Sequence, residues 1–460
     1  MRKDGYQSDG DRLKRSVGGP LERRRFLKTS LAASAGLWAA PGRVVAESQQ
    51  PLPRTKLPVA GVVTEYRRNS HADVILGKIL EGYNQDGGVG PDLQLVSLYV
   101  DQFPKGDMSR QLAKRFNVRL CKSIDEAVTL GQNRVAVAGV LSIGEHGSYP
   151  LVPETQQRMY PRKRFFDGIV RAMERGGGVV PVFSDKHLSY RTDEVLEMYR
   201  TATEMKIPFM AGSSLPVAWR SPKIDVPIGA ELQTALAVGY GGFESYGFHA
   251  LETLQCMVER RRGGEVGVKS VRAVQGTAVL EARDQGYWSN ELLLAALGTQ
   301  SKKLPADWQD RLLSKSMAFY LIDYLDGFRA CVAMLNGLTA TFLFACQVAG
   351  RAEPIATEFT LQDGPPYRHF EWLVRAIDPM MHTRKASYPV ERTVLTSGIL
   401  DAIMHSLADG GKRIPTPQLG IGYQPVNWSP APGQPPKPRA WSSAAIQVPV
   451  ARRRHVFRDV

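Results

Sequence analysis

The stretch Val179-Val-Pro-Val-Phe-Ser-Asp-Lys-His-Leu188 decides the predicted fold of this 460-residue chain. Its first five residues are apolar and have the length of a buried strand, and four polar residues follow directly. The run lies between two amphipathic segments, 161–175 and 192–205, with the periodicity of helices. Gly176-Gly-Gly178 separates the first helix from the strand, as expected where a helix ends. The stretch therefore indicates a helix–strand–helix unit.

The same alternation of strands and helices extends over residues 55–215. Further strands are expected at 59–63, 93–100, 118–120, 135–143 and 207–211, and further helices at 71–82 and 109–116. Ser123-Ile-Asp-Glu126 has the spacing of a capping box and predicts one more helix start. Strands that alternate with helices favour a parallel, doubly wound sheet, in which ligands bind beyond the carboxyl ends of the strands.

Residues 223–415 show a different pattern, which predicts an α+β domain. Strands are expected at 266–280, 317–325, 328–335, 338–347 and 354–361. Asp326-Gly327 and Asn336-Gly337 predict hairpin turns between neighbouring strands, and hence an open antiparallel sheet. The predicted fold class is therefore α/β, with an N-terminal Rossmann-like doubly wound parallel sheet and a C-terminal α+β domain with an open antiparallel sheet.

The net charge of +14 at first favours a protein that binds polyanions. Residues 1–46 carry +6 and residues 430–460 carry +5, which leaves only +3 on residues 47–429. We therefore expect no nucleic-acid partner, because the body is nearly neutral and has no aromatic-basic motif. No run of 18 apolar residues occurs, so no transmembrane anchor is expected. The four cysteines are widely spaced, and we predict no metal site from them.

The N-terminus has the pattern of an export signal. Arg23-Arg-Arg-Phe-Leu-Lys28 precedes the weakly apolar residues 29–40, and Val44-Val-Ala46 offers a small-residue cleavage site. The segment resembles a twin-arginine (Tat) signal, with Glu22 where Ser or Thr is usual. The Tat pathway exports folded proteins. We therefore expect a Tat-like signal peptide at 1–46, the Tat export machinery as a partner, and a periplasmic location.

These patterns divide the chain into four expected parts. After the signal peptide come a Rossmann-like domain at 55–222 and an α+β substrate and oligomerisation domain at 223–415. A tail rich in Pro and Arg follows at 416–460. Its prolines cannot continue a helix or an inner strand, so an extended conformation is expected there.

Polar residues follow the predicted strands at the edge where ligands bind in such sheets. The residues after the first, second, fourth and fifth strands are 64–71, Asp101, Glu145-His146 and Asp185-Lys186-His187. Three of the chain's eight histidines, His71, His146 and His187, lie at these positions. The ligand site is therefore predicted at this edge.

The order of these elements resembles that of the Gfo/Idh/MocA family, nicotinamide-dependent oxidoreductases that act on sugars, inositols and related polyols. The resemblance spans residues 57–415. Residues 182–188 are similar to the family's Glu-Lys-Pro-Leu segment, and residues 241–252 are similar to the helix entry of its second domain. Residues 389–406 are similar to its C-terminal helix.

The resemblance implies that Lys186 orients or polarises a substrate hydroxyl and that His249 exchanges its proton. Both residue types suit proton transfer near neutral pH. It also implies NAD(P) as cofactor, a carbohydrate or polyol as substrate, and a homo-oligomer. The candidate cofactor-binding residues are Thr64, Tyr66, Arg67, Asp101, Glu145, His146 and Asp185. The candidate substrate-binding residues are His187, Trp219 and Arg220.

The turn after the first strand departs from the family pattern. The family has Gly-x-Gly-x-x-Gly/Ala there, so that the backbone approaches the pyrophosphate, whereas this chain has Thr64, Tyr66 and Asn69. Arg67 and Arg68 could bind phosphate through their side chains instead. Three functions stay open. They are an NAD(P)-dependent oxidoreductase, a non-redox carbohydrate lyase, hydrolase or epimerase with or without a metal, and a catalytically inactive sugar-binding protein.

Overall fold

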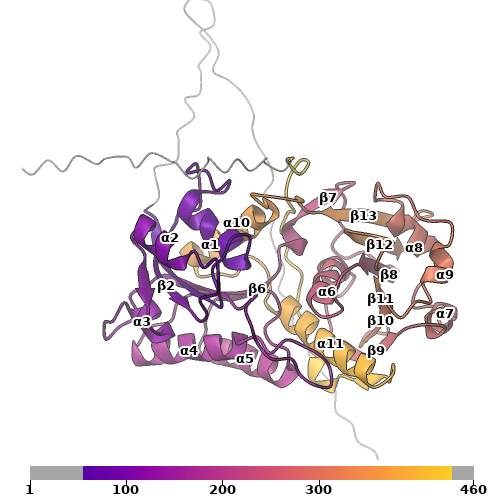
Figure 1. The fold of residues 1–460 in the computed structure, drawn as a ribbon. Helices are drawn as coiled ribbons and strands as arrows, with labels where there is room; N and C mark the ends of the chain where they lie inside the picture. The colour runs from indigo at the N-terminus through magenta and orange to yellow at the C-terminus, as the bar shows by residue number, and fades with distance from the viewer. Residues whose placement is uncertain (1–54, 438–460) are drawn as a thin grey trace, which may run out of the picture. The chain divides into compact units, whose positions relative to one another are not determined.

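The computed structural model describes residues 55–437, which belong to one compact unit (Figure 1). The expected signal peptide at 1–46 and the arginine-rich end of the tail lie outside the described residues. No helix between residues 55 and 437 is long and apolar enough to cross a membrane.

The first sheet consists of six parallel strands. They are β1 (Leu57–Val63), β2 (Leu93–Val100), β3 (Arg119–Cys121), β4 (Gly139–Ile143), β5 (Val182–Asp185) and β6 (Phe209–Gly212). Their order is β3-β2-β1-β4-β5-β6, the order of a Rossmann fold, with the topological switch point between β1 and β4. The strands β1, β4 and β5 are buried along most of their length because helices cover both faces of the sheet. The predicted doubly wound sheet is confirmed.

Five helices connect these strands where the sequence predicted them. They are α1 (His71–Glu81), α2 (Ser109–Phe116), α3 (Ile124–Thr129), α4 (Arg162–Arg175) and α5 (Thr192–Glu204). The capping box is present at the start of α3. The Ser123 hydroxyl accepts a hydrogen bond from the Glu126 amide at 3.1 Å, and the Glu126 carboxylate accepts one from the Lys122 amide at 2.9 Å.

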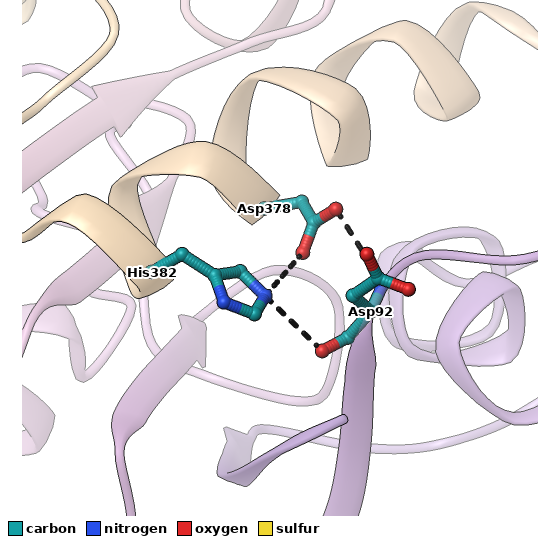
Figure 2. Close-up of side chains that lie close together, drawn as sticks. All are labelled: Asp92, Asp378 and His382. Carbon is teal, nitrogen blue, oxygen red and sulfur yellow. Dashed lines mark hydrogen bonds and ion pairs between the residues drawn. The ribbon is translucent and has the colours of Figure 1, made fainter. Parts of the chain in front are cut away.

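Helix α10 (His369–Thr383) was not predicted, and it returns from the C-terminal part of the chain to the first sheet. It packs against α1, and Leu373 and Ile377 are fully buried in the same core as β1 and β2. Figure 2 shows how its last turn is tied to the start of β2. His382 Nε2 lies 3.2 Å from the carbonyl oxygen of Asp92 and 3.4 Å from Asp378 Oδ1.

The second sheet has eight strands and is mostly antiparallel, as predicted. They are β7 (Trp219–Ser221), β8 (Leu232–Gly239), β9 (Val268–Val274), β10 (Ala318–Tyr324), β11 (Arg329–Met334), β12 (Phe342–Val348), β13 (Ile355–Thr360) and β14 (Ile414–Pro415). Their order is β14-β9-β10-β11-β8-β12-β13-β7, and β8 and β11 run parallel. The sequence analysis missed β8, whose small residues give a weak strand signal.

One of the two predicted hairpins is confirmed and the other is wrong. Gly327 has a φ of 85° in the turn between β10 and β11, and the Tyr324 amide donates to the Phe328 carbonyl at 2.9 Å. Asn336 and Gly337 also form a turn, in which the Leu338 amide donates to the Leu335 carbonyl. However, β8 lies between β11 and β12, so the strands on either side of this turn are not neighbours.

Helices cover both faces of the second sheet. Figure 1 shows α6 (Ser245–Val258) and α11 (Glu391–Ala408) between the first-sheet elements and the second sheet. On the other face lie α7 (Ala278–Asp284), α8 (Asn290–Leu297) and α9 (Trp308–Arg311). Because α8 contacts β8, β12 and β13, part of the face expected to bind another copy is already covered. The homo-oligomer stays a prediction.

The described part of the tail, 416–437, contains the short 3-10 helix Pro417–Leu419 and otherwise no helix or strand, and it lies against the rest of the molecule. The Ala431 amide donates to the Val217 carbonyl at 3.0 Å. The Trp219 indole donates to the Pro432 carbonyl at 3.1 Å, and the Gln362 amide group donates to the Pro436 carbonyl at 3.0 Å. The tail therefore contacts the segment around β7 and the loop after β13.

Candidate functional site

A cavity of about 580 Å³ lies where the carboxyl ends of the first sheet face α6 and the second sheet. This volume is in the range of small-molecule sites. The wall residues on the first-sheet side include Asn69, His71, His146, His369 and Phe370. The wall residues from α6 and the second sheet include Tyr240, Tyr246, His249, Phe342 and Glu358. The cavity thus lies at the edge that the strand order and the sequence predict.

Three residues at this edge have a left-handed backbone although none is a glycine. Asn69, His146 and Lys186, which follow β1, β4 and β5, have φ values of 61°, 71° and 64°. Such conformations cost free energy in L-residues with a side chain and concentrate at functional sites, where the surrounding structure holds them. Two of these three residues, Asn69 and His146, are also in the cavity wall.

Lys186 belongs to a buried network of charges behind the cavity wall. Its ammonium lies 3.1 Å from Glu145 Oε1, and the Arg162 guanidinium lies 2.5 Å from Glu145 Oε2. Burial alone would raise the pKa of Glu145, but the charges of Lys186 and Arg162 hold that pKa well below its usual range. Glu145 is therefore ionised, and it binds the end of β4 to the end of β5.

His187 lies in the same buried layer. Arg162 donates to its Nε2 at 2.9 Å, and burial and the charge of Arg162 keep the pKa of His187 well below its usual range. The side chain is almost fully buried and is not part of the cavity wall. The structure therefore places His187 behind the predicted site instead of in contact with a ligand there.

His71 and Asp185 form a second, separate pair at the cavity. Nδ1 of His71 lies 2.6 Å from Oδ2 of Asp185. The Asp185 side chain is fully buried, whereas His71 is part of the cavity wall. The neighbouring His146 is also in the wall, and burial together with the charge of His71 lowers the pKa of His146 to about 4.

His249 lies on α6, on the opposite side of the cavity from β1. Burial, followed by the charges of Lys186 and His71, holds the pKa of His249 well below its usual range. The imidazole is therefore neutral at neutral pH and can accept a proton. Among the residues described, its Nδ1 has no hydrogen-bond partner.

Glu252 follows His249 by three residues and fixes α6 in place. Its carboxylate accepts a hydrogen bond from the Ser213 amide at 2.6 Å, just after β6, and one from the Thr393 hydroxyl at 3.3 Å. Burial raises the pKa of Glu252 to about 7. The sequence analysis quoted Glu252 at the end of a motif but gave it no role.

The turn after β1 does not direct its predicted cofactor-binding side chains into the cavity. The Thr64 hydroxyl donates to the Glu145 carbonyl at 2.6 Å. Tyr66 is fully buried in the core beneath α1, and Arg67 pairs with Glu65 at 2.5 Å on a partly exposed surface. None of these three predicted residues is part of the cavity wall.

Asp101 also forms its hydrogen bonds with other residues of the chain. Its carboxylate accepts hydrogen bonds from Tyr99 at 2.8 Å and from Tyr149 and Arg164 at 2.7 Å. Burial alone would raise the pKa of Asp101, but the hydrogen bonds from Arg164 and the tyrosines lower it. The Gln102 side chain bonds to both the amide and the carbonyl of Ser148 at 2.9 Å. These contacts bridge the segments that follow β2 and β4.

The N-terminus of α1 is likewise occupied by side chains. The Ser70 hydroxyl accepts from the Asp73 amide at 3.4 Å, and the Asp73 carboxylate accepts from the Asn69 amide at 2.8 Å. Nδ1 of His146 lies 3.5 Å from the His71 amide. In Rossmann folds the pyrophosphate of a dinucleotide uses the amides at this position.

Trp219 and Arg220 lie away from the cavity. Both side chains are buried in or beside β7, and the Trp219 indole donates to the tail, as described above. The Arg220 guanidinium donates to the carbonyls of Pro216 and Ala218 and packs 3.6 Å from the centre of the Phe359 ring. The side-chain nitrogens of Trp219 and Arg220 thus donate hydrogen bonds within the chain.

Sequence reasoning missed several wall residues, namely Tyr240, Tyr246, Phe342, His369 and Phe370. His369 and Phe370 come from α10, and no local pattern in the sequence places that helix beside β1. Burial, followed by the charge of Lys78, lowers the pKa of His369 to about 3, so this histidine is neutral as well.

Within residues 55–437, one group of side chains has the spacing of a metal site, namely Asp92, Asp378 and His382. The group does not belong to the cavity wall. Figure 2 shows that His382 Nε2 lies beside the Asp92 carbonyl. The contacts of this group therefore attach the last turn of α10 to the residue before β2. The four cysteines are buried and free.

No model of a protein family matches the chain, and no curated protein sequence matches it. Solved structures match its fold. The structure of GenD2 from gentamicin A biosynthesis in complex with NAD is 14% identical, with a TM-score of 0.50, and the match covers 79% of this chain and 97% of GenD2.

Two other solved structures match at lower TM-scores. An oxidoreductase from Agrobacterium radiobacter, in complex with NAD+, L-tartaric acid and magnesium, is 12% identical (TM-score 0.48; 78% of this chain and 98% of that chain). The scyllo-inositol dehydrogenase of Lactobacillus casei, with NAD(H) and scyllo-inositol, is 9% identical (TM-score 0.47; 78% and 99%).

The likeness to GenD2 shows the fold, a Rossmann-like parallel sheet followed by a mixed, mostly antiparallel sheet. At the position where that fold holds the pyrophosphate, the residues of this chain do not form a cradle. There is no glycine between Thr64 and Ser70, and the amides of Asn69, His71 and Asp73 face side chains of the chain itself.

The raised pKa of Glu252 predicts a pH-dependent stability. Because the folded state favours the protonated carboxyl, this contribution to stability is fully present below the ordinary pKa of a glutamate and is lost as pH rises through about 7. Glu252→Gln, which mimics the protonated form, should match the wild type at about pH 4. At about pH 8 it should be the more stable, by on the order of 3 kcal/mol.

Urea unfolding of both proteins at the two pH values measures this difference. Glu353→Gln, at an exposed glutamate, is the control. Its free energy of unfolding should differ from that of the wild type by the same amount at both pH values. An equal difference at both pH values for Glu252→Gln would contradict the prediction.

Proposed function

We propose that the chain is an enzyme of the oxidoreductase-like fold that acts on a sugar or polyol bound in the cavity. The observation that carries this proposal is the cavity wall. Neutral imidazoles at His146 and His249 lie there together with the rings of Tyr240 and Tyr246. Imidazoles exchange protons with hydroxyl groups, and aromatic rings pack against the apolar faces of sugars.

Lys186 and His249 are the centre of the proposed catalysis. His249 accepts the proton of a substrate hydroxyl. Lys186 acts through its charge from behind the wall, where Glu145 holds it and where it contributes to the low pKa of His249. A positive charge at this position stabilises negative charge that develops on a substrate oxygen.

NAD(P) is the proposed cofactor, which the NAD-containing structures of similar fold support. When bound, it would supply hydride transfer. Because the first turn lacks the pyrophosphate cradle, the segments after β1, β2 and β4 would have to exchange their mutual hydrogen bonds for bonds to such a cofactor.

A non-redox enzyme is the second candidate, and the same bridging hydrogen bonds favour it. A lyase, hydrolase or epimerase needs the cavity and its acid–base groups but no dinucleotide crevice. Both candidates share the substrate class and the proton transfer, and they differ in whether a hydride leaves the substrate.

A nucleotide and product analysis separates the two candidates. The purified full-length protein is denatured, and released nucleotides are measured by mass spectrometry. A panel of myo-inositol, D-glucose and D-glucuronate is then incubated with and without NAD+ or NADP+. Reduction of added or bound nucleotide supports the first candidate, and a new product without nucleotide supports the second. If no compound of the panel or of a wider set of sugars is converted, the enzyme proposal fails.

Lys186→Ala should lower turnover by about 100-fold or more, the usual range for the loss of an acid–base or electrostatic group. Arg162 still pairs with Glu145 in this variant, so the circular dichroism spectrum should stay that of the wild type. Lys163→Ala is the matched control, because Lys163 pairs with Asp167 and Glu197 on the helix surface. Retained turnover in Lys186→Ala would refute the assignment.

We further propose that the chain is exported to the periplasm through the Tat pathway, on the strength of the sequence around Arg23 and Arg24. Replacing both by Lys should leave the full-length precursor in the cytoplasmic fraction, as measured by fractionation and immunoblotting. The control replaces Arg12 and Arg15 by Lys, which should leave export unchanged. Export of the Arg23 and Arg24 variant at the wild-type level would contradict the proposal.

A further inference from the structure

The pair of His71 and Asp185 joins two elements that the strand order brings together at the cavity. His71 is the first residue of α1, directly after the turn that follows β1, and Asp185 is the last residue of β5. We propose that His71, oriented by the buried carboxylate of Asp185, is the base that takes the proton from the substrate hydroxyl. This inference rests on the substrate class and the cavity of the proposed function, and it replaces His249 by His71 as the acceptor of the hydroxyl proton.

The contacts of the ring leave one nitrogen for a ligand. Nδ1 of His71 is held at 2.6 Å by Asp185, so Nε2 is the nitrogen that remains. The His71 side chain is 14% exposed and lies in the cavity wall, whereas Asp185 is completely shielded from solvent. A carboxylate at Nδ1 requires a proton on that nitrogen, which keeps Nε2 unprotonated in the neutral ring.

The environment of Asp185 strengthens this orientation. Its Oδ1 has no hydrogen-bond partner among the described residues, so within residues 55–437 His71 supplies the hydrogen bond of this carboxylate. Burial of a carboxylate costs free energy unless a positive charge or a hydrogen-bond donor pairs with it. Asp185 therefore stabilises the positive charge that His71 acquires when Nε2 takes up a proton.

The ring of His71 is also held in place from its sides. Its centre lies 5.1 Å from that of Phe370 and 5.2 Å from that of His146, both in edge-to-face arrangements. The His71 amide lies 3.5 Å from Nδ1 of His146. By contrast, Nδ1 of His249 has no partner that would select one tautomer of its ring. His71 is therefore the better oriented base of the two.

Other pairs of histidine and carboxylate in residues 55–437 differ from this one. They are His382–Asp378 at 3.4 Å, His405–Asp401 at 3.6 Å and His187–Glu244 at 3.9 Å, and each uses Nε2. In contrast to His71, none of these histidines is in the cavity wall. The short Nδ1 contact and a position in the cavity wall occur together at His71.

The proposed step moves one proton and no electrons. The O–H bond of the substrate breaks, an N–H bond forms at Nε2 of His71, and the electron pair stays on the substrate oxygen. Asp185 keeps its negative charge and offsets that of the imidazolium. Both the redox and the non-redox candidate need this step.

Nitrogen NMR of the full-length protein with ¹⁵N-labelled histidine tests the tautomer without any substrate. The His71 signals are assigned by their loss in His71→Gln. We expect the proton on Nδ1 and an unprotonated Nε2 in the neutral ring. In Asp185→Asn the Nδ1 tautomer should lose population, because the Asn amide can donate to Nδ1. A proton on Nε2 in the wild type, or an unchanged tautomer in Asp185→Asn, would overturn the inference.

Kinetics then test the role, with the compound of the panel that the wild type converts. His71→Gln should lower kcat by about 100-fold or more with little change in KM, as for the loss of a general base. Asp185→Asn should also lower kcat. The pH profile of kcat in this variant should shift, because the tautomer of His71 changes. His405→Gln is the matched control, because His405 also pairs with an aspartate but is exposed and lies outside the cavity.

The outcomes for this inference and for the proposed function are distinct. If His71→Gln keeps wild-type kcat while Lys186→Ala or a His249→Gln variant loses it, His71 is not the base and the proposed function stands. If no sugar or polyol is converted, the proposed function fails, and the inferred proton transfer fails with it even where NMR shows the Nδ1 tautomer. The NMR result then identifies an oriented pair without this role.

Discussion

The buried carboxylate of Glu145 is the interaction on which the site depends. It is held by Lys186 from the end of β5 and by Arg162 from the start of α4, at 3.1 and 2.5 Å. An unpaired charge at this depth would cost several kcal/mol, so the two cations and the carboxylate stabilise one another's positions. Because these residues follow adjacent parallel strands, the network also fixes the left-handed backbone at His146 and Lys186, next to the cavity.

The segments at the carboxyl edge of the first sheet are joined by hydrogen bonds within the chain. In this chain the segments after β1, β2 and β4 bond to one another through Thr64, Gln102 and Tyr149. Polar groups that would otherwise face a cofactor or water are thus satisfied within the protein. The cavity that remains is bounded by α6, by the second sheet and by α10, and its chemistry is that of imidazoles.

Much of the fold could be predicted because it rests on local patterns. The strands of the first sheet, the capping box at Ser123 and the Asp326-Gly327 turn each have a signal within a few residues. The position of β8 between β11 and β12 has no such signal, since Ala-rich segments suit several structures and the pairing is non-local. At the site, the residues after β1, β4 and β5 were predicted as a group. The distinction between wall residues such as His71 and buried ones such as His187 depends on side-chain packing, which the sequence does not display.

The return of α10 to the first sheet has a consequence for synthesis of the chain. The strands and helices that end at β6 leave the ribosome more than a hundred residues before α10, whose Leu373 and Ile377 complete the core beside β1 and β2. Before α10 has been made, the apolar surface of α1 that packs against it is not buried. The Rossmann-like half therefore reaches its native packing only after the segment up to Thr383 has been made.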